Sequence, residues 1–251
     1  MCKCMSGRLI FAQKLVIILV IAFLTGLISC YSVSKRLELQ GGSVQMNLDQ
    51  YTDKIIHVAD HWGNHFTGIA SSFPPGYGLV EFDREENSVN VNRCQIFESD
   101  IAQIEELPKM EIIRATQLFQ QAGAYYVRIQ AMAKKHHITL RQEFDEHDGP
   151  DTKYIVVTDD DFPIATARMY PLDDSRMMIG RVVVLPEYRH RGIGTMVVCE
   201  CEDWAEDLHY TRTVLESRDN KVEFYELLGY EVCGEAVEGD TFRCIRMEKK
   251  L

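Results

Sequence analysis

The sequence predicts an α/β (α+β) domain over residues 110–251, preceded by a small region at 46–109 and an apolar segment within 1–45. Strand-like and helix-like patterns of apolar residues alternate regularly only after Met110. Charge changes at the same boundaries. Residues 1–45 hold five Lys or Arg and one Asp or Glu, residues 46–109 hold four and eleven, and residues 110–251 hold 18 and 26, which gives +4, −7 and −8. The chain therefore reads as three pieces.

The composition excludes some classes of protein. Apolar residues make up 46% and charged residues 26% of the 251 residues, which is ordinary for a folded protein. The net charge of −11 argues against nucleic acid as the main partner. The eight cysteines lack the spacing of a disulfide framework and include no CxxC pair. We therefore expect free thiols in a reducing compartment and no zinc ribbon.

The first piece contains 19 residues without a charge, Leu15 to Val33, flanked on both sides by basic residues. This length can span a bilayer, and the pattern also describes a secretory signal. The segment "LISC", Leu27 to Cys30, resembles a lipobox, in which the cysteine is lipidated. The positive-inside rule mildly favours a cytoplasmic N-terminus with the rest outside. Met46 is an alternative start of translation.

Residues 77–83 and 88–97 predict two strands around a polar turn, and residues 98–107 predict a short acidic helix. Before them, His57, His61 and His65 recur every four residues, so on a helix they would share one face, as metal ligands can.

We favour a half-exposed amphipathic helix with polar histidines over a metal site. Gly63 and Asn64 interrupt the pattern, and the sequence offers no fourth ligand. No metal site is predicted, and no activity is assigned to residues 46–109.

The third piece predicts strands and helices in a regular order. One helical stripe within 195–210 carries Met196, Val197, Cys201, Trp204 and Leu208. The predicted strands are 110–115, 152–160, 162–171, 176–186, 211–217, 230–235 and 241–249, and the predicted helices are 116–136, 195–210 and 220–229.

The stretch "LPEYRHRGIG", Leu185 to Gly194, lies where a strand meets a helix. Pro186 ends the strand, since proline cannot donate to a ladder. The glycines permit a tight turn and leave no side chains between the backbone amides and a ligand. The first amides of a helix have no intrahelical partner and lie at the positive end of its dipole. With Arg189 and Arg191 beside them, they predict a site for a phosphate or pyrophosphate. The alternative is a basic surface turn.

These residues resemble the acyl-CoA signature of the GNAT superfamily of N-acetyltransferases, R-x-x-G-x-G/A after a strand that ends in V-x-P. Two more segments resemble family motifs: "FYELLGY", Phe224 to Tyr230, and "EFDEHD", Glu143 to Asp148, which is similar to a segment of a bacterial branch. The resemblance covers about residues 110–251. It implies a mixed central sheet with splayed strands flanked by helices, and acetyl-CoA as co-substrate.

Carried onto this chain, the resemblance implies a set of cofactor-binding residues. The strand backbone would contact the pantetheine arm at Val182 and Val184, and an N–H at Val183 or Val184 would polarise the thioester carbonyl. Asn220 resembles a frequent cofactor-contacting asparagine, and its alternative role is a helix N-cap. The pyrophosphate would lie on the amides of Arg191, Gly192, Ile193, Gly194 and Thr195, flanked by Arg189 and Arg191.

Tyr225 resembles the tyrosine that many members use as general acid toward the CoA thiolate, and a phenol is protonated at neutral pH. Its alternative role is a core aromatic. Many members place a Glu where this chain has Gly180. Glu143, Glu146 and Asp148 are substitute bases, or else a solvated acidic turn. No Cys or Ser lies in a nucleophile motif, so no covalent acyl-enzyme is expected.

The expected function is transfer of an acetyl group from acetyl-CoA to the primary amine of a small molecule or peptide, within a ternary complex. A GNAT module that binds acyl-CoA without turnover is the alternative. We expect a cytoplasmic catalytic domain, with a possible membrane tether at residues 15–33, because acetyl-CoA is an intracellular metabolite. A lipidated protein that faces outward would conflict with this.

Overall fold

The computed structural model describes residues 46–71, 87–149, 151–238 and 243–251. The apolar segment 15–33 and the predicted strand 77–83 lie outside these ranges. Within them, no helix is long and apolar enough to cross a membrane. The described residues belong to one compact unit, which contains two sheets.

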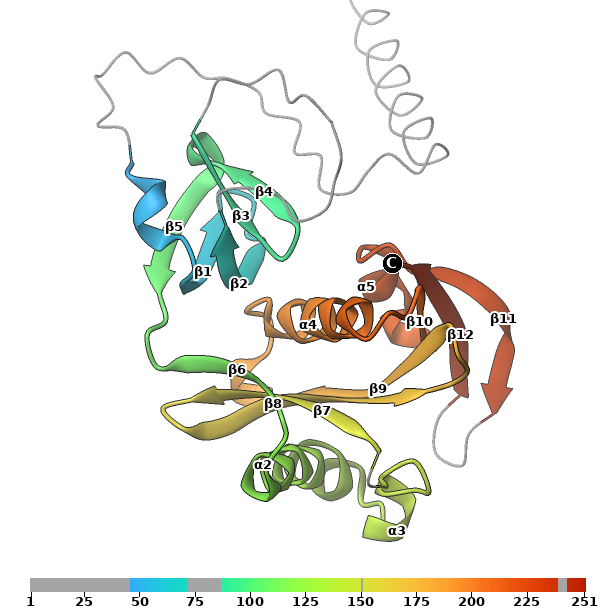
Figure 1. Ribbon diagram of the computed structural model, residues 1–251. Helices are drawn as coiled ribbons and strands as arrows, with labels where there is room; N and C mark the ends of the chain where they lie inside the picture. The colour runs from blue at the N-terminus through green and yellow to red at the C-terminus, as the bar shows by residue number, and fades with distance from the viewer. Residues whose placement is uncertain (1–45, 72–86, 150, 239–242) are drawn as a thin grey trace, which may run out of the picture. The chain divides into compact units, whose positions relative to one another are not determined.

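The first sheet is antiparallel, with the strand order β4-β3-β2-β1-β5 (Figure 1). A short 3₁₀ helix, η1 (Leu48–Tyr51), precedes this sheet, and a second one, η2 (Glu98–Asp100), connects β4 to β5. This sheet has a hydrophobic core of its own, which includes the buried side chains of Ile56, Val58 and Val91. The strands are β1 (Ile55–Asp60), β2 (His65–Ser71), β3 (Ser88–Val91), β4 (Cys94–Phe97) and β5 (Ile101–Glu106).

The predicted helix over residues 55–66 is wrong. This segment is the hairpin β1–β2, in which His57 lies opposite Thr67. Gly63 has a φ of 85° at the turn, and the Asp60 carboxylate accepts from the amide of Asn64 at 2.8 Å. The four-residue histidine spacing therefore spans two strands and a turn, so the three side chains do not follow one helical face.

Two further predictions for this region need correction. The segment 88–97 is two strands, because Asn92 and Arg93 have φ values of 51° and 65°. Positive φ at both central residues makes the tight turn of a hairpin. The predicted acidic helix at 98–107 is largely strand β5, which pairs with β1. Tertiary pairing here overrides the weak local preference for helix.

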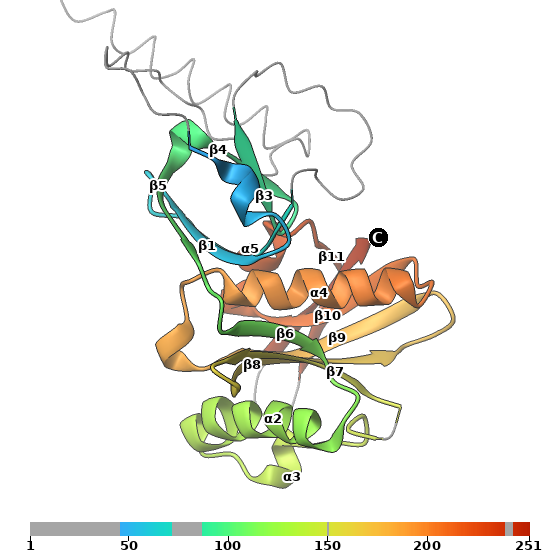
Figure 2. The ribbon, with the colours of Figure 1, turned by 60° about the vertical axis from the view of Figure 1, so that its left-hand side comes forward.

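The second sheet has seven strands in the order β11-β12-β10-β9-β8-β7-β6, and β9–β10 is its parallel pair. Helices α4 (Ile193–Asp207) and α5 (Val222–Glu226) lie on one face, and α2 (Leu118–Arg128) and α3 (Leu140–Glu143) lie on the other (Figures 1 and 2). The strands are β6 (Met110–Arg114), β7 (Lys153–Asp159), β8 (Phe162–Pro171), β9 (Arg176–Val184), β10 (Arg212–Arg218), β11 (Glu231–Glu238) and β12 (Arg243–Lys250).

The predicted order of elements in residues 110–251 is confirmed. The long helix continues from α2 into a π-helical segment, η3 (Ile129–Lys134), and α5 is shorter than the predicted 220–229. The stripe on α4 packs on the sheet through Met196, Val197 and Cys201, whereas Leu208 lies just past the end of the helix. The main core is the layer between this helix and the sheet.

Strand β9 bends away from β10 part-way along its length. The two strands pair only from Arg176–Arg212 to Ile179–Leu215, although β9 continues to Val184. Beyond Gly180 the register of β9 against β8 shifts by one residue, and Arg181 has a φ of 49°. Such a bulge bends the strand that carries it. The sheet is therefore splayed, as the family resemblance implied.

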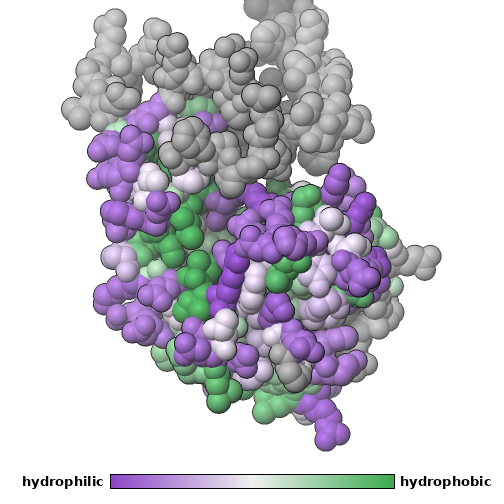
Figure 3. Space-filling model, viewed as in Figure 1, coloured by the Kyte–Doolittle hydropathy of each residue, from purple (hydrophilic) through white to green (hydrophobic). Residues whose placement is uncertain are grey.

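Apolar side chains also gather on the face seen in Figure 3, where they appear green. A hollow of about 460 Å³ lies between residues of the two sheets. Its apolar lining includes Ile55, Ile69, Leu107, Met110 and Ile112. This hollow contains none of the predicted site residues.

Candidate active site

The predicted anion loop begins where β9 leaves β8. The amide of Leu185 donates to Ile164 O at 2.9 Å as the last bond to β8, and Pro186 then starts a single 3₁₀ turn, η4 (Pro186–Tyr188). The Nε of Arg189 donates to Val184 O at 2.9 Å, which ties the loop back to the strand. Arg189 therefore holds the loop in place, a role that the sequence did not predict.

The loop ends at the first turn of α4, where several backbone amides lack a partner within the helix. Gly192 is the N-cap with a φ of 79°, and the first hydrogen bond of the helix runs from the amide of Met196 to Gly192 O at 3.1 Å. The amides of residues 193–195 therefore have no acceptor inside the helix, and they lie at the positive end of its dipole. This geometry suits a phosphate group.

The two glycines of the loop differ in how much space their surroundings leave for a side chain. A Cβ on Gly194 would meet Phe224 Cζ at 3.6 Å, which is ordinary contact. A Cβ on Gly192 would lie 2.6 Å from the amide nitrogen of Thr67 and 2.7 Å from His65 O, both in strand β2. The positive φ and the close approach of β2 therefore require a glycine at position 192. The tight turn predicted from the sequence is confirmed at Gly192, whereas the approach of β2 is not visible in the sequence.

The splayed strand turns one backbone edge toward the gap beside β10. Because Leu185 N–H points to β8, and successive N–H groups of a strand point to opposite edges, the Val184 N–H points into the gap. Val183 is buried on the α2 side, and Val182 and Val184 pack toward α4. Of the two candidates for polarising the thioester carbonyl, the geometry favours Val184.

Tyr225 lies on α5, half-buried, and it packs against the same apolar cluster as Val182. Its ring meets Tyr230 edge-to-face at 5.9 Å. Burial raises the pKa of Tyr225 above its usual range, so the phenol keeps its proton at neutral pH. Asn220 is exposed in the turn η5 (Asp219–Lys221), and the N-cap of α5 is Lys221, so the N-cap alternative for Asn220 is wrong.

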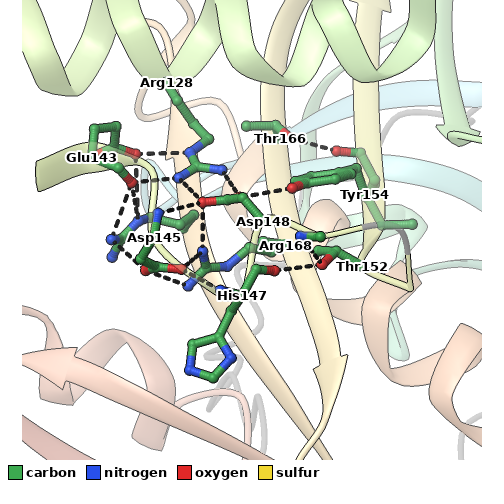
Figure 4. Close-up of polar contacts among 12 residues, drawn as sticks. Arg128, Glu143, Asp145, His147, Asp148, Thr152, Tyr154, Thr166 and Arg168 are labelled. Carbon is green, nitrogen blue, oxygen red and sulfur yellow. Dashed lines mark hydrogen bonds and ion pairs between the residues drawn. The ribbon is translucent and has the colours of Figure 1, made fainter. Parts of the chain in front are cut away.

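The acidic segment "EFDEHD" is held by arginines (Figure 4). The fully buried Arg128 donates from Nε to Glu143 Oε1 at 2.8 Å and from Nη1 to Asp148 Oδ1 at 2.5 Å. Tyr154 Oη also donates to Asp148 Oδ1, at 2.7 Å. Burial alone would raise the pKa of Asp148, but its bonds to Arg128 and Tyr154 hold that pKa well below the usual range. A carboxylate with so low a pKa is a weak base.

The same segment reaches the bulge in β9. Asp145 pairs with Arg168 at 2.6 Å and with Arg181 Nη2 at 3.1 Å. Arg181 also donates to the backbone carbonyl of Glu143 at 3.2 Å. The predicted solvated acidic turn is therefore wrong for Glu143 and Asp148, and it holds for the exposed Glu146. Arg128 lies in the apolar stripe of its helix. A buried arginine needs an acidic partner, so this position was a sequence signal for the ion pairs with Glu143 and Asp148.

The position that many members fill with Glu is open here. A Cβ built on Gly180 meets no atom within 4 Å. The strand therefore has room for a side chain at this point.

Two cysteines of α4, Cys199 and Cys201, have thiols that resist ionisation. Within the described ranges, none of the five cysteines is in a disulfide. Burial raises the pKa of Cys199 to about 12, and burial also raises the pKa of Cys201 well above its usual value. In these ranges, no group of three His, Cys, Asp or Glu residues is placed to hold a metal ion.

Comparison with known proteins agrees with this geometry. A sequence profile described as "Acetyltransferase (GNAT) family" matches residues 116–230. The crystal structure of a protein from Lactobacillus plantarum, classed as an N-acetyltransferase, is 31% identical, with a TM-score of 0.54 over 57% of this chain and 98% of that one. The chain belongs to the GNAT acetyltransferase family.

Two other known proteins are similar to part of this chain. The "uncharacterized N-acetyltransferase YjcF" of Bacillus subtilis is 28% identical over 126 residues, which cover 50% of this chain and 89% of that protein. An acyl-CoA N-acyltransferase from Pseudomonas aeruginosa, 20% identical with a TM-score of 0.50, shares the fold. GNAT proteins use acetyl-CoA or another acyl-CoA, so this chain carries an acyltransferase domain. The GNAT profile does not extend to residues 46–109.

Proposed function

We propose that this protein is an acetyl-CoA-dependent N-acetyltransferase that acts on a primary amine by direct attack in a ternary complex. The observation that carries the proposal is the gap between β9 and β10, which leads directly into the loop before α4. The gap offers the Val184 N–H to the thioester arm, and the loop offers its amides to the pyrophosphate. Arg191 adds positive charge at that end.

In the proposed reaction the neutral amine attacks the thioester carbonyl. A C–N bond forms, the C–S bond breaks, and the CoA thiolate takes a proton from the hydroxyl of Tyr225. The proton released by the amine passes to solvent, and solvent returns a proton to the Tyr225 phenolate, so that the enzyme is restored. The Val184 N–H supports the charge that develops on the carbonyl oxygen, and positioning of the two substrates supplies much of the rate.

The proposal needs no general base from the acidic segment. Glu143 and Asp148 are both committed to Arg128, and Gly180 carries no side chain. Glu146, the third candidate base, is exposed to solvent, and in this proposal the amine arrives neutral. We expect kcat/KM to rise about tenfold per pH unit up to the pKa of the amine. Gly180→Glu, which places a carboxylate in open space, should raise kcat/KM below that pKa.

The test uses the full chain, with acetyl-CoA binding measured by calorimetry. Turnover on a panel of amines is followed by chromatography of free CoA, since the eight cysteines would react with thiol reagents. Tyr225→Phe should bind acetyl-CoA with an unchanged Kd and lose kcat about 100-fold. Tyr230→Phe, a buried tyrosine whose hydroxyl bonds Thr213 at 2.9 Å, is the matched control and should retain kcat.

Each outcome has a defined meaning. Absence of acetyl-CoA binding would refute the proposal. Binding without turnover on any amine would favour the non-catalytic acyl-CoA-binding module instead. Full activity of Tyr225→Phe would remove this tyrosine from the mechanism.

We also propose a cytoplasmic location for the domain, because acetyl-CoA is an intracellular metabolite. Sequencing the N-terminus of the mature protein tests this. A mature start at Cys30 would indicate a lipidated protein and contradict the proposal, whereas a start at Met46 would agree with it.

A further inference from the structure

Strand β2 of the first sheet packs directly on the anion loop. The hypothetical Cβ of Gly192 would clash with the backbone of His65, Phe66 and Thr67, at distances of 2.6 to 3.0 Å. Gly192 therefore permits close contact between the backbone of the loop and the backbone of β2. This contact lies at the loop that the proposed function assigns to the cofactor's pyrophosphate.

A chain of hydrogen bonds crosses the same contact. His65 Nδ1 lies 3.2 Å from His57 Nε2, and His57 Nδ1 lies 2.8 Å from Thr67 Oγ. The Thr67 hydroxyl donates to the backbone carbonyl of Arg191. The two imidazoles stack with their centroids 5.2 Å apart. Three side chains of the first sheet thus form a chain of hydrogen bonds whose last member, Thr67, bonds one carbonyl of the loop.

The partners determine the direction of every bond. A carbonyl oxygen only accepts, so the single hydroxyl hydrogen of Thr67 points to Arg191 O. His57 Nδ1 must then carry a hydrogen and donate to Thr67. In a neutral imidazole the other nitrogen accepts, so His65 Nδ1 donates to His57 Nε2.

The charges around His57 agree with the neutral form. Burial lowers the pKa of His57 most, and the nearby Arg191 and His65 lower it further. Glu105 on β5, opposite His57, acts in the other direction, and its Oε1 lies 3.9 Å from Arg191 Nη2. His57 is therefore neutral at neutral pH.

The Arg191 carbonyl and the Gly192 amide belong to one peptide group. The described chain has no cis peptide bond, so this group is trans and its N–H points opposite to its C=O. With the carbonyl held by Thr67, the Gly192 N–H points away from β2. A bond accepted at the carbonyl also polarises the N–H of the same group and strengthens it as a donor.

We propose that Thr67, held by His57 and His65, is a positioning residue of the acyl-CoA site, which orients the Arg191–Gly192 peptide so that its N–H binds the pyrophosphate. The first sheet is then part of the cofactor site. The inference rests on the proposed function, because it needs a pyrophosphate at this loop.

The test compares acetyl-CoA with S-acetyl-pantetheine, which lacks the pyrophosphate and the nucleotide. Thr67→Ala in the full chain should weaken acetyl-CoA binding about fivefold by calorimetry, as loss of one hydrogen bond predicts. Its kcat/KM with S-acetyl-pantetheine should equal that of the wild type. Thr67→Ser keeps the hydroxyl and should restore the affinity for acetyl-CoA.

Thr158→Ala is the matched control. Thr158 is also a buried threonine on a strand, but its hydroxyl has no hydrogen-bond partner among the described residues, so both substrates should behave as with the wild type.

The results separate the two proposals. A wild type that does not bind acetyl-CoA refutes the proposed function. A wild type that binds, with Thr67→Ala binding equally well, refutes only the positioning role. Equal losses with acetyl-CoA and S-acetyl-pantetheine also refute it, because they indicate general damage. If Thr67→Ala does not fold, Thr67→Ser decides: wild-type preference for acetyl-CoA over S-acetyl-pantetheine supports the role, and a lost preference refutes it.

Discussion

Replacing Arg128 by Met should destabilise the protein more than any change at a surface ion pair. The Arg128 side chain is fully buried, and its partners Glu143 and Asp148 are only 2% and 6% exposed. The guanidinium also lies over the Phe144 ring at 4.3 Å. Removing one partner of a buried pair costs about 3 to 5 kcal/mol, because it leaves an uncompensated buried charge.

The structure places the expected loss at the lower end of that range. Asp148 keeps Arg168 at 2.9 Å and the hydroxyl of Tyr154, and Glu143 keeps Arg181 at 3.4 Å. We therefore expect a loss of about 3 kcal/mol in the free energy of unfolding. For a unit of about 200 residues this lowers Tm by roughly 6 to 12 °C.

Urea unfolding at pH 7 measures this loss through the fluorescence of the chain's two tryptophans, Trp62 and Trp204. Arg176→Met is the control, because its pair with Asp173 has both side chains 40% exposed and should contribute less than about 1 kcal/mol. A loss in Arg128→Met no larger than that of the control would refute the reasoning.

Three further predictions concern the contact between the sheets and the anion loop. Arg93→Met breaks a 2.9 Å pair with the buried Glu202 and should cost about 2 to 3 kcal/mol in urea unfolding; strictly additive effects of Arg93→Met and Glu202→Gln would contradict this coupling. Burial lowers the pKa of His57, so the unfolded chain binds the proton better, and stability falls as the pH drops below about 6.5. His57→Gln should reduce the difference between urea midpoints at pH 7.5 and 5.5, and an unchanged difference would contradict this assignment. His190 has a φ of 60°, so His190→Gly should raise stability by about 1 kcal/mol in thermal unfolding, whereas a lower Tm would show that the His190 side chain makes a stabilising contact.

Sequence patterns predicted the GNAT domain well because their causes are local. The periodicity of apolar residues in 110–251 matches the strands and helices, and Pro186 and Gly192 mark the turn before α4. The same reasoning failed at 55–66 and 98–107. Both segments are polar enough to resemble amphipathic helices, and β1, which pairs with β2 in a hairpin, also pairs with β5 from the second segment. Strand pairing over such a separation leaves only a weak local signal.

The sequence by itself determined the order of elements in residues 110–251, the place of the turn before α4 and the residue types that surround it. Only the tertiary structure decided what those residues contact. Arg128 neutralises two of the predicted bases, Arg93 holds α4 through Glu202, and Thr67 bonds the carbonyl of Arg191 from 124 residues away. Local patterns follow from the geometry of a helix or a strand, so they can be read along the chain. Buried ion pairs and hydrogen bonds between distant segments depend on which surfaces pack together, and this is determined when the whole core folds.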